Sequence, residues 1–136
     1  MFTGPIEDRT AIRELHETYA LGVLSRDPVL WGTTWDEDAV WTLIGHTVQG
    51  RAAIVALWTA AMAGFEAVSF LAVPAAITVT GDTASAITQT HEILREAGGR
   101  TRVTGGAYDD RLIRRDGRWL YAERRFRIVA EYGETA

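Results

Sequence analysis

The sequence predicts an α+β domain in which three N-terminal helices cover one face of a curved antiparallel sheet. Helical periodicity fills the first half of the chain, and strand-like alternation with short turns begins near residue 68. Helices grouped before strands are typical of this class. The 136 residues suit one domain, so we expect a single domain over residues 1-136. A curved sheet capped by helices leaves a central pocket, and we expect the functional residues there.

Three segments carry helix signals. The first covers residues 7–26, where one stripe at helical spacing is formed by Ile12, Leu15, Tyr19, Gly22 and Val23. Asp27 followed by Pro28 predicts the N-cap and the first residue of a short second helix. Gly50 precedes a third helix, which we expect over residues 51–63.

The remaining segments predict strands. The acidic residues 36–38 indicate a polar turn, and a short strand is expected over 39–43. Four longer strands are expected over residues 70–80, 84–96, 102–115 and 118–129. The turns between them are marked by Gly81-Asp82, Gly98-Gly99 and Asp116-Gly117, and Asp-Gly is a strong signal for a tight hairpin. The four strands would form a meander, and residues 131–136 are expected to fray.

Composition narrows the functional classes. Cysteine is absent, which excludes disulfides, thiolate nucleophiles and cysteine-based metal sites. No run of about 18 apolar residues occurs and no signal-peptide pattern opens the chain, so we expect no membrane partner and a cytoplasmic location. The net charge of −4 argues against a nucleic-acid partner. The arginines between residues 111 and 127 lie on both faces of two strands and are mixed with acidic residues, which indicates an ion-paired sheet surface that faces solvent or a dimer partner.

Several segments spread over residues 7–129 share a pattern with one known family. They are residues 11–19, residues 35–41, Gly50, residues 81–84 and the hairpin over 105–119, followed by Arg124. In these segments the chain resembles the SnoaL-like branch of the nuclear transport factor two-like superfamily, which includes scytalone dehydratase, bile-acid dehydratase, lindane dehydrochlorinase and polyketide cyclases. The resemblance implies an α+β cone: a curved antiparallel sheet capped by three helices around a pocket.

The resemblance also bears on the chemistry. The dehydratase-like relatives abstract a proton with a His–Asp dyad. The Asp position corresponds here to Leu24, the His position corresponds to Ser69, and Val73 stands where an Asn often follows. Both halves of the dyad are therefore replaced in this chain.

Other pocket positions of the family are retained at Tyr19, His91, Asp110 and Arg124. We therefore predict His91 as the general base, Asp110 as the residue that orients it, and Tyr19 as a donor to an enolate oxygen. Asp109 and Asp110 are consecutive and face opposite sides of the sheet, and the resemblance favours Asp110 for the pocket.

Each candidate has a structural alternative. Alternation places His91 on the same sheet face as Gln89, and a neighbouring side chain could hold this histidine for structure alone. Asp110 could form a salt bridge with Arg124 or Arg111, and Tyr19 could be a core residue with its hydroxyl at the surface.

A second group is expected to contact the ligand: Trp41, Trp58, Ser69, Gln89, Tyr108 and Arg124. His46 lies after Gly45 in an expected turn and His16 on the outer part of the first helix, so we expect both in solvent. The histidines are far apart in sequence and lack metal-ligand spacing, so no metal is expected.

The combined prediction is a cofactor-independent lyase or isomerase-type enzyme, such as a dehydratase, isomerase or cyclase. It would abstract a proton from a small hydrophobic oxygenated substrate, such as a polyketide or steroid-like molecule. The alternative is a non-catalytic pocket protein that binds a hydrophobic small molecule or serves as a dimerising association module. His91 meeting Asp110 inside a closed cavity would favour the enzyme, and His91 facing solvent would favour the binder. The resemblance further implies a homodimer through the sheet, with Trp119 or Tyr121 on exposed strands.

Overall fold

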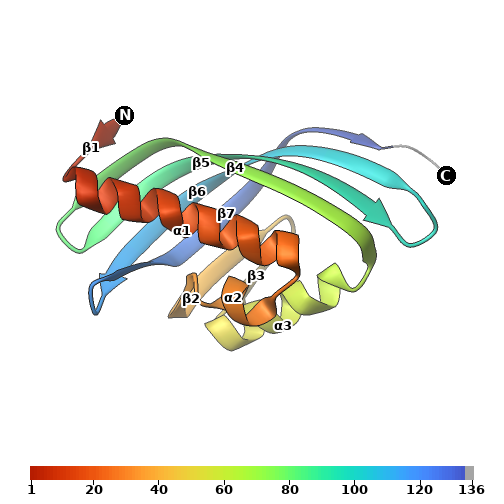
Figure 1. The fold of residues 1–136 in the computed structure, drawn as a ribbon, viewed down its shortest axis with the longest axis horizontal. Helices are drawn as coiled ribbons and strands as arrows, with labels where there is room; N and C mark the ends of the chain where they lie inside the picture. Colours follow the sequence, from red (N-terminus) through yellow and green to blue (C-terminus); the bar gives the residue numbers. More distant parts are fainter. Residues whose placement is uncertain (134–136) are drawn as a thin grey trace.

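The computed structural model describes residues 1–133 and has three helices on one side of a seven-stranded sheet within that range (Figure 1). The helices are α1 (Ile6–Ser25), α2 (Pro28–Gly32) and α3 (Arg51–Met62). The strands are β1 (Phe2–Thr3), β2 (Trp35–Leu43), β3 (His46–Gln49), β4 (Phe65–Thr80), β5 (Thr83–Glu96), β6 (Thr101–Arg115) and β7 (Arg118–Gly133). Their order in the sheet is β1-β4-β5-β6-β7-β2-β3. The predicted α+β class is confirmed.

The helices begin and end close to the predicted residues. α1 ends where Arg26 adopts a left-handed conformation with φ of 51°. The chain then enters α2 through Asp27, whose carboxylate accepts hydrogen bonds from the amides of Val29 and Leu30 at 3.0 and 3.1 Å. These bonds satisfy two of the amides that a helix N-terminus leaves free, as the Asp27-Pro28 pair predicted.

The predicted meander is confirmed, since β4 to β7 pair antiparallel in sequence order. The remaining strands lie at the two edges, where β1 pairs parallel with β4 and β2 pairs parallel with β7. Strands β1 and β3 were not predicted. β4 also begins five residues earlier than predicted, and β7 continues through Gly133, so residues 131–133 are paired with β6 rather than frayed. The rest of the predicted fraying segment, residues 134–136, lies outside the described residues.

The predicted polar turn at residues 36–38 is wrong, because these residues belong to β2. Asp36 is buried, and its carboxylate accepts a hydrogen bond from Arg115 Nε at 2.6 Å. The charge of Arg115 compensates the carboxylate, which allows an acidic residue inside a strand. The pairing of β2 with β7 is irregular between Trp35 and Val40, and this irregularity accommodates the acidic segment.

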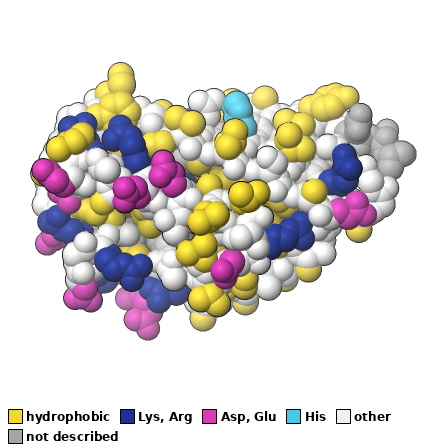
Figure 2. Space-filling view, viewed as in Figure 1, with side chains coloured by type: hydrophobic (Ala, Val, Ile, Leu, Met, Phe, Trp, Pro, Cys, Tyr) yellow, Lys and Arg dark blue, Asp and Glu magenta, His cyan; other side chains and the backbone are white. Residues whose placement is uncertain are grey.

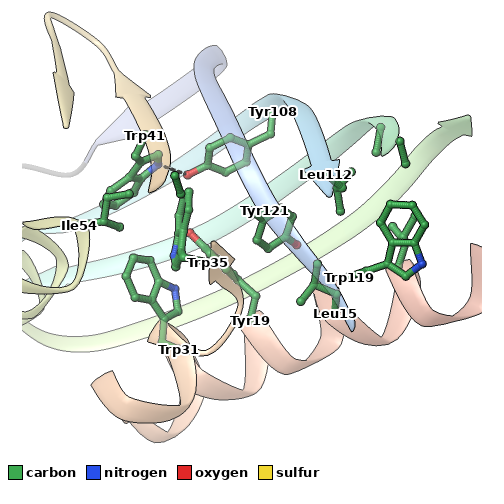
Figure 3. Packing of buried hydrophobic residues seen from close by; sticks show 14 of the residues in the cluster. Leu15, Tyr19, Trp31, Trp35, Trp41, Ile54, Tyr108, Leu112, Trp119 and Tyr121 are labelled. Atoms are coloured by element: carbon green, nitrogen blue, oxygen red, sulfur yellow. Dashed lines mark hydrogen bonds between the residues drawn. The ribbon is translucent and has the colours of Figure 1, made fainter. Parts of the chain in front are cut away.

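Aromatic rings dominate the core between the three helices and the inner face of the sheet (Figure 3). Trp31 stacks on Trp58 with ring centroids 4.5 Å apart, and Tyr19 lies against Trp31 at 5.3 Å. Trp119 and Tyr121, which were expected on exposed strands, are buried in this core. The indole of Trp119 donates to Asp8 at 3.0 Å. Neither ring can therefore contribute to an interface on the outer sheet face.

Arginines and acidic residues intermingle at the end of the molecule that carries the start of α1 and the turn between β6 and β7 (Figure 2). Arg114 contacts Asp8 at 2.8 Å and Asp82 at 2.7 Å, and Arg115 contacts Asp36. This surface is laced with ion pairs, as the mixed charges indicated. None of the helices in the described part of the chain is both long and apolar enough to cross a membrane.

Candidate functional site

A cavity of about 270 Å³ lies between α3 and the curved end of the sheet. Every layer of the fold contributes to its wall: α1, α3, and strands β2, β4, β5, β6 and β7. Most of the lining is apolar or aromatic, and the polar groups that reach it belong to Tyr19, Trp41, Glu92, Arg102 and Tyr108. A few polar groups converging in an apolar hollow are the usual composition of a small-molecule site.

Two phenols form one wall of this cavity. The hydroxyl of Tyr108 accepts a hydrogen bond from the indole nitrogen of Trp41 at 3.1 Å (Figure 3). Burial raises the pKa of both Tyr108 and Tyr19 above the ordinary value of a phenol, although the charge of Arg124 opposes this. Both hydroxyls are therefore protonated at neutral pH and can donate hydrogen bonds to a ligand oxygen.

Glu92 is the only carboxylate that lines the cavity among the described residues. It lies on β5 and is partly buried. Burial raises the pKa of Glu92 from an ordinary 4.5 to about 6; the guanidinium of Arg102 opposes this shift, and the carboxylate of Glu131 adds to it. A carboxylate with this pKa is mostly ionised at pH 7 yet binds a proton more readily than an exposed glutamate, which suits a general base.

A buried polar network lies deeper in the fold. Arg124 donates two hydrogen bonds to the carboxylate of Asp110, from Nε to Oδ1 at 2.7 Å and from Nη2 to Oδ2 at 3.1 Å. Thr88 donates to the same carboxylate at 2.7 Å, and His16 Nε2 lies 3.5 Å from it. Burial alone would raise the pKa of Asp110, but the charge of Arg124 and the hydrogen bonds around the carboxylate hold it below the ordinary value. The network is therefore a charged unit inside the protein.

His16 completes this network from α1. Its Nδ1 lies 2.9 Å from the carbonyl of Ile12, and its Nε2 lies 2.7 Å from the hydroxyl of Thr88. The carbonyl can only accept, and Thr88 gives its hydrogen to Asp110, so the pattern is satisfied when both ring nitrogens donate. His16 was expected in solvent but is 2% exposed, which corrects that prediction. The spacing of α1 carried a signal for this role, because His16 follows Ile12 by four residues and precedes Tyr19 by three, which places it on the buried stripe.

Arg124 links the network to the cavity wall. Its guanidinium carbon lies 3.8, 4.1 and 4.6 Å from the ring centroids of Tyr108, Tyr121 and Tyr19, respectively. Arg124 itself is fully buried beneath these rings and does not line the cavity, so its predicted ligand contact is not seen. Its pairing with a carboxylate, the structural alternative for Asp110, is confirmed.

The prediction that His91 is the base is wrong, because His91 lies on the outer face of the sheet, away from the cavity. His91, Gln89 and Ser69 are all exposed on the outer face, and the amide of Gln89 lies 3.4 Å from the His91 ring. Asp110 is buried on the inner face, so the predicted His91–Asp110 pair does not form. Alternation correctly grouped His91 with Gln89, but it could not tell which face of the sheet was inside.

The other predicted positions divide as follows. Asp110 rather than Asp109 faces inward, as predicted, and Tyr19, Trp41, Trp58 and Tyr108 line the cavity. Leu24 is 73% exposed, and Val73 is also exposed, so neither of these two positions reaches the cavity. His46 is exposed, as expected, although it begins β3 instead of lying in a turn.

Glu92 and Arg102 were missed as site residues. Both lie inside strands that were predicted, and Glu92 directly follows His91. The signal that could have found Glu92 is the second alternating series in β5, Thr88, Thr90, Glu92 and Leu94, which is the buried series. The isoleucines on either side of His91 made the opposite face look more apolar. Within residues 1–133, no group of three or more His, Asp or Glu side chains is arranged to hold a metal ion.

Comparison with known proteins places this geometry in a family. The family model named SnoaL-like domain matches residues 5–125 of the chain. The chain belongs to the SnoaL-like domain family. A search among curated proteins found no significant match.

Solved structures agree with this SnoaL-like assignment. A Novosphingobium aromaticivorans DSM protein, provisionally assigned as an aromatic ring hydroxylase, is 28% identical with a TM-score of 0.89, over 97% of this chain and 96% of that one. Rv3472 of Mycobacterium tuberculosis, of unknown function, is 27% identical with a TM-score of 0.83, over 91% and 77%. A type 2 hexachlorocyclohexane dehydrochlorinase (LinA) is 19% identical with a TM-score of 0.87, over 96% and 91%. The SnoaL-like domain thus has the cone fold of the nuclear transport factor two-like superfamily.

Proposed function

We propose that this SnoaL-like domain is a cofactor-independent lyase or isomerase-type enzyme, in which Glu92 abstracts a proton from a small, neutral, hydrophobic and oxygenated substrate. One observation carries the proposal: a carboxylate with a pKa of about 6 lines a cavity whose wall is mostly apolar and aromatic. Glu92 takes the role that the sequence had given to His91.

The chemistry follows from the groups that share the cavity. Glu92 would take a proton from the carbon next to a carbonyl group, and the electron pair of the broken C–H bond would move onto the carbonyl oxygen. Tyr19 and Tyr108 are protonated donors on the same cavity wall and would stabilise the resulting enolate. Loss of a neighbouring leaving group would complete an elimination, and return of the proton to a different carbon would complete an isomerisation.

Cavity size and charge restrict the substrate. A volume of about 270 Å³ lies just below the range of about 300–1,000 Å³ that ligand pockets usually span. This favours a substrate of one or two rings over a four-ring steroid. Arg102, the one arginine that lines the cavity among the described residues, lies 3.7 Å from both Glu96 and Glu131. Its charge is therefore already compensated, which favours a neutral ligand over a carboxylate.

The comparison with solved structures supports an elimination. The type 2 LinA protein is by name a hexachlorocyclohexane dehydrochlorinase, and an enzyme of that name removes hydrogen chloride from its substrate. The same fold with a base in its cavity would serve dehydration or isomerisation equally well, since all three begin with removal of a proton from carbon.

A proton-abstraction probe tests the proposal. In 5-nitrobenzisoxazole, a base that takes the ring C–H proton causes the N–O bond to break, which releases a coloured cyanophenolate. The wild-type chain should accelerate this ring opening over free acetate, and Glu92→Gln should lower kcat/KM by about 100-fold or more. His91→Ala and Glu66→Gln, which change exposed residues, should leave the rate unchanged. A Glu92→Gln variant with wild-type activity would refute Glu92 as the base.

The alternative function is non-catalytic ligand binding. It is favoured by the exposed position of His91, which was the outcome expected for a binder, and by Leu24 and Ser69, which replace the family dyad and both face solvent. A binder would retain a neutral aromatic probe such as 2-naphthol in the cavity, with equal affinity for wild type and Glu92→Gln, and would not open the benzisoxazole ring.

We also propose that the chain forms a homodimer through the outer sheet face. Exposed apolar side chains gather there on β4, β5 and β7, among them Leu71, Val73, Ile93 and Tyr132. An apolar surface of this kind favours association with a second copy. Analytical ultracentrifugation should detect a dimer that Leu71→Asp converts to a monomer. A monomeric wild-type chain at micromolar concentration would refute this interface.

A further inference from the structure

Three side chains form one row across the sheet, and the row begins at the cavity with Glu92. Glu92 on β5 pairs in register with Thr104 on β6, and Thr104 pairs in register with Glu131 on β7. Thr104 is buried, and its hydroxyl donates to Glu131 Oε2 at 2.9 Å. Because in-register neighbours on one face have Cβ atoms about 4.5–5.5 Å apart, this row holds two carboxylates on either side of one hydroxyl.

Arg102 fixes the outer carboxylate of the row. It lies two residues before Thr104 on β6, so it faces the same side of the sheet, and its Nε is 3.7 Å from Glu131 Oε2. The Glu131 side chain is 38% exposed, whereas Glu92 lines the cavity. The row therefore runs from the cavity to solvent, with an inner carboxylate, a buried hydroxyl and an outer carboxylate.

The groups that face Glu92 come from several elements. Strand β6 contributes Arg102 and Tyr108, β7 contributes Glu131, and α1 contributes Tyr19. The in-register neighbour on β4 is Phe70, which carries no charge. Arg102 favours the ionised form of Glu92, and Glu131 is the negatively charged group that opposes it.

We propose that Glu131 is a positioning residue for Glu92: Thr104 and Arg102 hold its carboxylate at the outer end of the row, where its negative charge acts on the carboxylate of Glu92. This inference rests on the proposed function for its catalytic meaning, since a base that binds its proton more firmly is a stronger base. The electrostatic coupling itself is a property of the fold and can be measured without a substrate. It is also a role for the C-terminal end of β7, which the sequence had assigned to a fraying tail.

A carbon-13 NMR titration of the side-chain carboxyl groups tests the proposal. The Glu92 resonance is identified as the one that disappears in Glu92→Gln, and its midpoint in the wild-type chain should lie at about pH 6. Glu131→Gln removes the like charge, so the midpoint should fall by about half a unit to one unit. Thr104→Val removes the hydroxyl that holds Glu131 in place, so it should lower the midpoint by a smaller amount.

Glu96→Gln is the matched control, because Glu96 lies at the same 3.7 Å from Arg102 but outside the row. Its effect on the Glu92 midpoint should be less than a third of the effect of Glu131→Gln. An unchanged midpoint in Glu131→Gln, or an equal shift in Glu96→Gln, would overturn the proposal. These outcomes are separate from the benzisoxazole test. Ring opening that depends on Glu92, without a shift in Glu131→Gln, would leave the proposed base standing and remove only the role of Glu131.

Discussion

Replacing Glu92 by Gln should stabilise the protein at alkaline pH. Burial raises the pKa of Glu92 from 4.5 to about 6. Between these two values the folded chain retains a proton that the unfolded chain has lost, so stability falls as pH rises through this window. The pKa of Glu92 differs by about 1.5 units between the folded and the unfolded chain, and each pKa unit corresponds to about 1.4 kcal/mol. The ionised carboxylate therefore lowers the free energy of unfolding by about 2 kcal/mol above pH 6. Because Glu92 is only partly buried, we take about 1 to 2 kcal/mol as the expected penalty.

Urea denaturation followed by tryptophan fluorescence measures this effect. The free energy of unfolding of Glu92→Gln, relative to wild type, should rise by about 1 to 2 kcal/mol between pH 4.5 and pH 8. Gln keeps the size of the side chain, so the comparison isolates the charge. Glu66→Gln, which removes an exposed carboxylate from β4, is the control and should show no such rise. A relative stability of Glu92→Gln that stays level or falls toward pH 8 would refute the reasoning, and with it the tuned base.

Two further predictions concern the packed interior. Asp110→Asn leaves the buried guanidinium of Arg124 without its counter-charge and should lower the free energy of unfolding by about 3 to 5 kcal/mol. The control, Asp109→Asn on the outer face, should change the free energy of unfolding by about 0.5 kcal/mol or less. Equal effects of the two variants in urea denaturation would contradict the buried ion pair. Gly22→Ala would place a Cβ 2.8 Å from the Cβ of Trp31 and 2.9 Å from its Cα. The midpoint of thermal unfolding should therefore fall by an amount equivalent to about 1 to 3 kcal/mol. An unchanged midpoint would show that α1 and α2 can separate freely.

The architecture was readable from the sequence because its signals are local. The Asp27-Pro28 pair caps α2 through bonds to amides two and three residues away, and Asp116-Gly117 joins strands that are neighbours in sequence. Edge pairings were not readable in this way. β1 pairs with residues 77–78, far along the chain, and β2 accommodates its acidic segment only because Arg115 reaches Asp36.

The site illustrates the same division. The alternation of β5 separates His91 from Glu92 by itself, since adjacent residues in a strand face opposite sides. Which side is inside depends on where α1 packs against the sheet, and the charge that tunes Glu92 comes from Glu131, which is 39 residues away in the chain. The sequence alone determined the order of the helices and the long strands and the turns between those strands, and the family resemblance favoured Asp110 over Asp109 for the inner face. Only the tertiary structure decided which face of the sheet is inside, and with it which carboxylate lies in the cavity, because burial and charge proximity arise from contacts between distant segments.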